Sequence, residues 1–151
     1  MMKLVVISEQ IMKRLISLFV LFIVMLCNVS AQDKNQNDDI RSFITRMYED
    51  KLYENYDFLQ KHCSAELLKK LQDAYPYDAN GVAYATWLFR SGQQDSKPGS
   101  NGKPRMLEVK TDNGDWYIYR AIDMGWEFTK RIKVFNKNGK IVISDICPVK
   151  D

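Results

Sequence analysis

Apolar residues recur at steps of three and four between residues 40 and 59, which is the spacing of one face of an α-helix. This stretch predicts a helix of about five turns, with Asn37 or Asp38 as its N-cap and residues 55–57 as the place where it could break. The positions that share this face are Ile40, Phe43, Ile44, Met47, Tyr48, Lys51, Leu52, Tyr56 and Leu59. The first part of the domain is therefore expected to be helical.

Two shorter helical patterns follow. Ser64 is the expected N-cap of a second, leucine-rich helix, which should end at Tyr75 because the residue before Pro76 avoids helical angles. The apolar residues of 82–90 share a helical face, so a third helix is favoured there, with a strand as the alternative. Residues 91–104 are rich in Gly, Pro, Ser and Asn and are expected to form a long loop.

The remainder of the chain alternates between apolar and polar residues, which is the period of a β-strand. Two Asn-Gly turns and one Met-Gly turn separate the alternating runs, and Asn-Gly is the strongest short signal for a hairpin. Four strands are predicted, at residues 106–110, 116–122, 126–135 and 140–147. The expected fold class is α+β, with N-terminal helices packed on a curved four-stranded antiparallel meander.

The most apolar run is residues 15–27, which follow two positive charges and precede small residues at Val29 and Ala31. These are the three parts of a secretory signal peptide, and the run is shorter than the ~20 residues that a bilayer-spanning helix needs. We interpret residues 1–31 as a signal peptide whose true start is Met12. The protein is thus expected to be exported to the periplasm or the extracellular space, with no membrane span after cleavage.

Removal of this leader defines the rest of the chain as a flexible tether, residues 32–37, and a single α+β domain, residues 38–151. The leader holds three of the basic residues and one acidic residue, so the net charge of +3 falls to +1 after cleavage. The residues concerned are Lys3, Lys13, Arg14 and Glu9. A nearly neutral domain lacks the charge footprint of nucleic-acid binding.

Cys63 and Cys147 are the two cysteines that remain after the leader. In an oxidising compartment they could form a disulfide, and the alternative is a pair of free thiols that pack as small apolar residues. His62 is the one histidine of the chain, and no cysteine or carboxylate has metal-ligand spacing around it. We therefore expect no metal site, and a surface position for His62 between two helices.

The closing hairpin, residues 131–146, resembles the last two strands of the nuclear-transport-factor-two-like family, also called SnoaL-like or cystatin-like. In that family a helical pair lies across a strongly bent sheet, which implies a cone-shaped or cystatin-like roll here. Residues 84–95 are also similar to a segment of uncharacterised exported Bacteroidetes proteins, a family of unknown function. The cone fold hosts isomerases, dehydratases, binding modules and immunity proteins, and many members dimerise through the sheet, so a homodimer is one expectation.

Two groups of residues could line a ligand site. Arg120, Lys130 and Asp145 interrupt apolar stripes on the predicted strands, and could bind a polar or anionic ligand in the concave pocket. The alternatives are a structural ion pair, a bulge that shifts the register, or long side chains extending to a rim. The second group surrounds the start of the long loop, and is either a ligand lid, a partner surface or core packing; it comprises Tyr84, Trp87, Phe89, Arg90 and Asp95.

The chain has no phosphate loop, dinucleotide fingerprint, nucleophile elbow or zinc-protease helix, which favours a non-catalytic protein without a cofactor. The leading hypothesis is an exported module that binds a small ligand or another envelope protein. One alternative is a small isomerase- or hydratase-like enzyme, which predicts a deep cavity with Asp145 inside it at a raised pKa. The other is an immunity-type protein, which predicts a protruding charged or aromatic loop.

Overall fold

The computed structural model describes residue 12, residues 15–20 and residues 35–149. The chain divides into two compact units, Met1–Asn37 and Asp38–Asp151. In the first unit, residues 15–20 are helical and exposed. The expected start region 1–11 and the cleavage region 21–34 lie outside the described residues, so the signal peptide and the tether stay predictions. No helix in the described part of the chain has the length and apolar character needed to cross a membrane.

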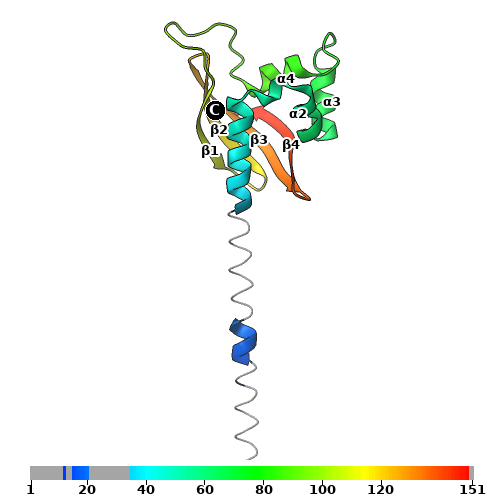
Figure 1. Ribbon diagram of the computed structural model, residues 1–151, viewed down its shortest axis with the longest axis vertical. Coiled ribbons are helices and arrows are strands. Elements are labelled where there is room, and N and C mark those ends of the chain that lie inside the picture. The colour runs from blue at the N-terminus through cyan, green and yellow to red at the C-terminus, as the bar shows by residue number, and fades with distance from the viewer. Residues whose placement is uncertain (1–11, 13–14, 21–34, 150–151) are drawn as a thin grey trace, which may run out of the picture. The chain divides into compact units, whose positions relative to one another are not determined.

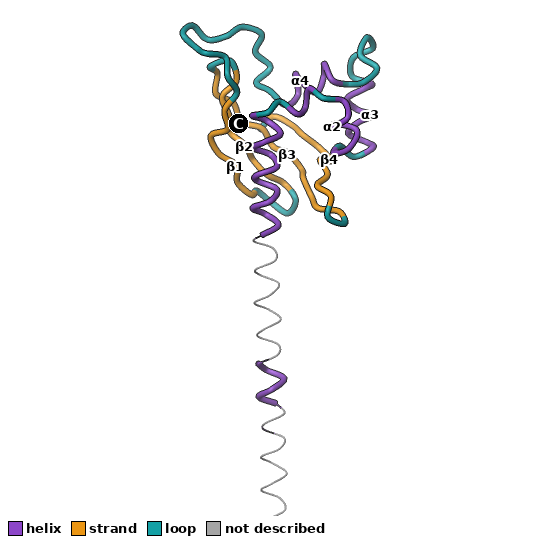
Figure 2. The backbone as a smooth tube through the Cα atoms, in the orientation of Figure 1, coloured by secondary structure: helices purple, strands orange, loops and turns teal. Residues whose placement is uncertain are grey.

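The second unit is an α+β domain in which helices precede an open four-stranded antiparallel sheet of order β1-β2-β3-β4, as predicted. Residues 38–49 are helical. The elements that follow are η1 Leu52–Glu54, α2 Tyr56–His62, α3 Ala65–Asp73, α4 Val82–Phe89, β1 Arg105–Thr111, β2 Trp116–Asp123, β3 Trp126–Lys137 and β4 Lys140–Pro148. Figures 1 and 2 show the helix of residues 38–49 lying across one face of the sheet, with α2, α3 and α4 gathered beside β4.

The first helix differs from the prediction at both of its ends. The expected five-turn helix ends before Lys51, whose φ of 51° is left-handed and stops the helical hydrogen-bond ladder. This reversal turns Tyr53 rather than Leu52 into the core, and Asn55 then caps α2 by accepting a hydrogen bond from the Phe58 amide (3.2 Å). Residues 35–37 are also helical, so the expected cap at Asn37 or Asp38 is wrong.

Two predictions about the later helices are confirmed. The hydroxyl of Ser64 accepts a hydrogen bond from the Leu67 amide (3.1 Å) and caps α3. Residues 82–89 are helical rather than extended. Gly81 allows this helix to begin against α3, since a Cβ at this position would lie 2.8 Å from the carbonyl carbon of Leu71.

The core lies between the helices and one face of the sheet. On β2 the buried residues are the odd-numbered Tyr117, Tyr119, Ala121 and Asp123, so the even-numbered stripe that includes Arg120 faces outward. Tyr119 can be fully buried because its hydroxyl donates a hydrogen bond to the carbonyl of Phe89 (2.8 Å). A core rich in tyrosine therefore depends on polar partners at its edges.

A β-bulge changes which face of the sheet the side chains of β4 point to. Val134 pairs with Ile143, but Lys133 pairs with Asp145, so one residue of β4 is skipped between them. Ile143 and Ile146 are buried on the inner face, and Asp145 lies beside Lys133 on the outer face. The register shift that was one alternative reading of this strand is therefore present.

The Cys63–Cys147 disulfide is absent, because both thiols are free. Cys63 forms an isolated bridge with Ile143, which is four residues from Cys147 along β4. Because of the bulge, Ile143 and Cys147 pair with residues only three apart on β3, which at roughly 3.3 Å per residue separates Cys147 from the bridge partner of Cys63 by about 10 Å. This is beyond the ~4.4–6.8 Å between Cα atoms that a disulfide allows. Burial raises the pKa of the Cys63 thiol to about 12, as expected for an inert packed cysteine.

Candidate functional site

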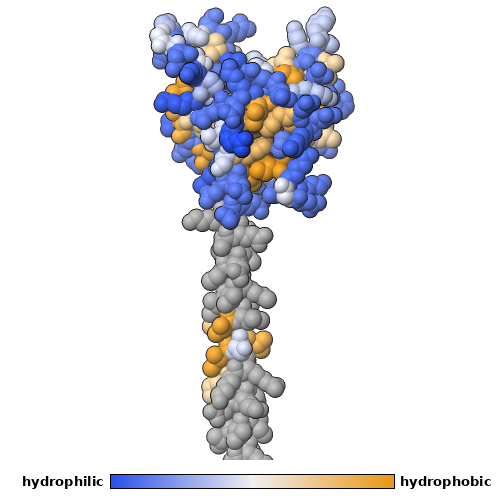
Figure 3. Space-filling view, in the orientation of Figure 1, coloured by the Kyte–Doolittle hydropathy of each residue, from blue (hydrophilic) through white to orange (hydrophobic). Residues whose placement is uncertain are grey.

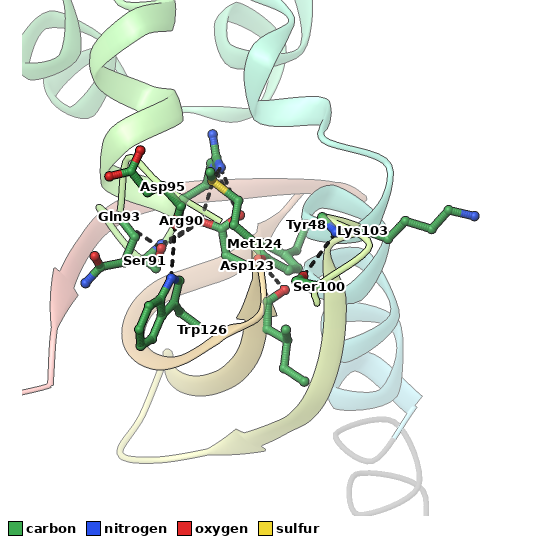
Figure 4. A network of polar contacts seen from close by, with 12 residues as sticks. Tyr48, Arg90, Ser91, Gln93, Asp95, Ser100, Lys103, Asp123, Met124 and Trp126 are labelled. Carbon is green, nitrogen blue, oxygen red and sulfur yellow. Dashed lines mark hydrogen bonds and ion pairs between the residues drawn. The ribbon is translucent and has the colours of Figure 1, made fainter. Parts of the chain in front are cut away.

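The site is organised by Asp123, the last residue of β2, which is only 3% exposed. Both carboxylate oxygens accept hydrogen bonds from Arg90, at the end of α4: Nε lies 3.1 Å from each oxygen and Nη2 lies 2.9 Å from Oδ1. The hydroxyl of Ser91 donates to Oδ2 at 2.7 Å, and its backbone amide lies 3.4 Å from the same atom. Figure 4 shows these groups converging on the carboxylate from the start of the long loop.

The partners of Asp123 make its burial tolerable. Burial by itself lowers the pKa of Arg90, but the hydrogen bonds to Asp123 and its negative charge outweigh that effect and raise it. Tyr48 lies nearby and donates its hydroxyl to the carbonyl of Ile122 (3.0 Å). Its pKa is raised, first by burial and then by the charge of Asp123, so its hydroxyl keeps its proton at neutral pH.

The long loop, residues 91–104, is fixed to the turn between β2 and β3. The indole of Trp126 donates to the carbonyl of Asp95 (3.0 Å), and the amide of Lys97 donates to the carbonyl of Met124 (2.8 Å). Gly125 lets the loop pass, because a Cβ there would lie 2.7 Å from the Cβ of Ser100. The long loop, for which a ligand lid is one of the sequence-based alternatives, is therefore anchored at several points along its length.

The turn itself has an unusual residue. Met124 and Gly125 both have positive φ (52° and 87°), the geometry of a two-residue hairpin turn that normally favours Asn, Asp or Gly at its first position. The sulfur of Met124 contacts Nη2 of Arg90 at 2.8 Å, the same nitrogen that donates to Oδ1 of Asp123. A methionine in this strained position therefore positions a guanidinium, and strain of this kind concentrates at functional sites.

A pocket of about 540 Å³ opens beside this network, between α4, the long loop and the β2–β3 turn. Its lining residues are Lys51, Ala83, Thr86, Trp87, Arg90, Gly92, Gln93, Gln94, Ser96, Gly102 and Met124. No carboxylate is among these described lining residues, whereas Lys51 and Arg90 carry positive charge. Three non-glycine residues in the described part of the chain have positive φ, and two of them, Lys51 and Met124, line this pocket.

Arg90 has unused hydrogen-bonding capacity at the pocket. Nε and Nη2 are engaged by Asp123 and Met124, but Nη1 contacts no partner within the described residues. Trp87 is 54% exposed and stacks on Tyr84 with 5.5 Å between ring centroids. The residues that line the pocket thus include one exposed aromatic ring, a guanidinium with two N–H donors that have no described partner, and the ammonium of Lys51.

The structure brings together only part of the predicted site residues. Trp87 and Arg90 line the pocket, and the ring of Tyr84 stacks on that of Trp87. Lys130 is buried on the inner face with its ammonium 5.8 Å from the centroid of the Trp87 ring. Burial lowers the pKa of Lys130. Asp95 contributes its backbone carbonyl to the loop anchor and is not a lining residue.

The proposed sheet-face cluster is not assembled. Arg120 lies on the outer face and pairs with Glu127 (2.9 Å), with both side chains about half exposed. Asp145 pairs with Lys70 of α3 (3.2 Å) and is 44% exposed. These are surface ion pairs, and they lie on the opposite face of the sheet from Lys130.

The central residue of the site, Asp123, escaped the sequence interpretation. The predicted strand ends at residue 122, and an aspartate in the turn that follows needs no partner to explain it. One feature of the sequence could have pointed to this turn. In Asp123-Met124-Gly125, methionine occupies the position where a hairpin turn normally has Asn, Asp or Gly.

Comparisons with known proteins add little to this geometry. The chain matches no protein-family model and no curated protein. Among solved structures, it is similar to the crystal structure of a protein of unknown function from Bacteroides thetaiotaomicron VPI-5482, with 20% identity and a TM-score of 0.46. The match covers 82% of this chain and 99% of that chain. The fold class of the domain is α+β.

Proposed function

We propose that this chain is an exported, non-catalytic binding module whose 540 Å³ pocket takes a small ring-containing anion. The leader-like residues 1–31 support export, and the hairpin of residues 131–146 supports a relationship to the nuclear-transport-factor-two-like cone. The observation that carries the ligand assignment is the guanidinium of Arg90, which is fixed by Asp123 and lines a pocket without acidic lining residues.

The physical argument is preorganisation. An arginine held by a buried carboxylate loses little conformational entropy when it binds a ligand, because its rotamer is already set. An anchored loop likewise needs no ordering on binding. A carboxylate accepts hydrogen bonds from arginine with good geometry, and an exposed tryptophan provides a stacking surface for a ring.

The test uses two matched pairs of compounds, benzoate with benzamide and glucuronate with glucose, titrated by calorimetry and by tryptophan fluorescence. In each pair the ring is similar and only one member is an anion, so we expect the anion to bind more tightly. Trp87→Phe should abolish the fluorescence response, whereas Trp116→Phe, on the outer face of the sheet, should preserve it.

A charge-removing variant sharpens the test. Lys51→Asn removes the ammonium but retains a residue that tolerates left-handed φ, so the fold is preserved. We expect this variant to bind the anion several-fold more weakly, while Lys61→Gln, on the exposed surface of α2, leaves binding unchanged. Equal affinity for anion and neutral partner, or no binding of either pair at millimolar concentration, would contradict the proposal.

The enzyme alternative has little support in this geometry. It required Asp145 inside a deep cavity, and the side chain instead lies in a surface ion pair with Lys70. The immunity-type alternative fits one observation better, since Tyr75 and Tyr77 protrude between α3 and α4, with Tyr77 89% exposed. A partner that binds there would be lost with Tyr77→Ser but retained with Trp87→Phe, which separates a protein partner from a pocket ligand.

A further inference from the structure

A second hollow, of about 520 Å³, lies between the helix of residues 38–49, α2 and the β3–β4 hairpin. Its lining residues are Asp39, Ser42, Phe43, Arg46, Leu52, Phe58, His62, Asn136, Gly139 and Ile141. Figure 3 shows hydrophobic residues gathered on this surface between the helix of residues 38–49 and α2. None of these residues lines the first pocket, so this hollow is independent of the proposed function.

The inner wall is aromatic and fixed. The rings of Phe43, Phe58 and His62 pack together, with centroid separations of 5.8 Å (Phe43–Phe58), 5.1 Å (Phe43–His62) and 4.7 Å (Phe58–His62). His62 is held by a hydrogen bond from Nδ1 to the carbonyl of Ile141 (2.9 Å), in which Nδ1 must be the donor because a carbonyl only accepts. These side chains remain partly exposed, so apolar surface faces the hollow without being covered by the described residues.

The rim carries charge of opposite sign at its two ends. Asp39 and Arg46 lie seven residues apart on the same helix, which places them about 10 Å apart along its axis at 1.5 Å per residue. Neither side chain has an ion-pair or hydrogen-bond partner among the described residues, although other charged residues of this helix do, as in the Arg41–Asp38 pair. An elongated ligand would therefore meet a free cation at one end, an apolar wall in the middle and a free carboxylate at the other end.

We infer that this hollow binds an elongated apolar monoanion, with its carboxylate at Arg46 and its chain against Phe43 and Phe58. Burial of alkyl surface contributes the affinity, and the guanidinium selects the anionic head. Asp39 disfavours a second negative charge at the far end, so a dicarboxylate of the same length binds less well. The volume is within the range of sites that enclose a small organic ligand.

The test measures binding of dodecanoate, 1-dodecanol and dodecanedioate to the full chain by calorimetry, below the concentration at which dodecanoate forms micelles. We expect dodecanoate to bind most tightly. Arg46→Gln should weaken dodecanoate binding by about threefold to fivefold, which is the effect expected from the loss of an exposed ion pair. The affinity for dodecanoate should then equal that for 1-dodecanol. Lys61→Gln, which removes a nearby exposed charge outside the hollow, is the matched control.

A second variant tests the far end. Asp39→Asn should raise the affinity for dodecanedioate by about twofold to fivefold and leave that for dodecanoate within twofold. Phe58→Ala should weaken all three compounds at least tenfold, with folding verified by circular dichroism, while Trp87→Phe changes none of them. Equal affinities of acid and alcohol, or a dodecanoate affinity unchanged by Arg46→Gln, would overturn the inference, as would failure of dodecanoate to saturate the protein.

Discussion

Arg90 and Asp123 join the end of α4 to the end of β2 through three hydrogen bonds of 2.9–3.1 Å, with the carboxylate almost completely buried. The pair is separated by 33 residues of sequence, a segment that contains the long loop, β1 and most of β2. It also sets the position of the guanidinium that lines the first pocket. One contact therefore serves both the stability of the domain and the geometry of its candidate site.

The first prediction concerns the strength of this contact. Asp123→Ala leaves the partly buried guanidinium of Arg90 without its counterion, and loss of one partner of a buried pair costs about 3–5 kcal/mol. We expect the free energy of unfolding, measured by urea denaturation, to fall by about 3 kcal/mol. Asp145→Ala removes an aspartate from the exposed pair with Lys70 and should cost less than about 1 kcal/mol. Similar losses in the two variants would show that the burial of Asp123 has no energetic weight.

The second prediction tests how the long loop is anchored. Gly125→Ala introduces a Cβ within 2.7 Å of Ser100 Cβ at a residue with φ of 87°, so it suffers both a clash and backbone strain. Gly139→Ala has a similar φ of 79° but nothing within 4 Å, so it suffers strain alone, about 1–2 kcal/mol. We expect the melting temperature to fall further in Gly125→Ala than in Gly139→Ala. Ser100→Gly, added to Gly125→Ala, should restore part of the difference, and its failure to do so would argue that the loop is free to move away.

These contacts show what the sequence could and could not predict. Helix 82–89, the Ser64 cap and the four-stranded meander follow from periodicity and turn chemistry, which are local. The break at Lys51 could not be predicted, because a left-handed lysine has no sequence signal and the apolar period continues past it. The Arg90–Asp123 pair spans 33 residues, so it is set by tertiary packing. The same holds for which face of β2 is buried, because that depends on where its tyrosine hydroxyls find hydrogen-bond partners.

The third prediction is a dependence of stability on alkaline pH. The Cys63 thiol has its pKa raised by burial from 9.0 to about 12, so the folded state retains a proton that the unfolded state loses. The stability that this provides is complete below pH 9 and is lost between pH 9 and 12, with a slope of at most about 1.4 kcal/mol per pH unit. Buried tyrosines add to the same slope, so the measurement is the difference between the protein and Cys63→Ala in urea denaturation across this range. An identical slope in the two proteins would contradict the burial of Cys63.

The same cysteine provides a chemical check on the absent disulfide. Because Cys63 and Cys147 are both free, each should react with one equivalent of a thiol reagent in denaturant without prior reduction, in addition to Cys27 where the leader is still present. In the folded protein Cys147, which is partly exposed, should react quickly and Cys63 slowly, since burial suppresses its thiolate. If neither Cys63 nor Cys147 reacted in denaturant, the two would have to be joined in a disulfide.

The last prediction concerns Lys130, a buried cation whose ammonium lies 5.8 Å from the centroid of the Trp87 ring. Burial lowers its pKa, which means that the folded state disfavours the ammonium, and a cation–π contact of ~0.5–2 kcal/mol offsets that cost only in part. Lys130→Met replaces the charge with an apolar chain of similar volume, so we expect the free energy of unfolding at neutral pH to rise by about 1 kcal/mol. Lys133→Met, on the outer face of the same strand, should leave it within about 0.5 kcal/mol. A loss of stability in Lys130→Met would mean that the ammonium contributes more through Trp87 than it loses by leaving water, and Trp87→Leu would then abolish the difference between the two lysine variants.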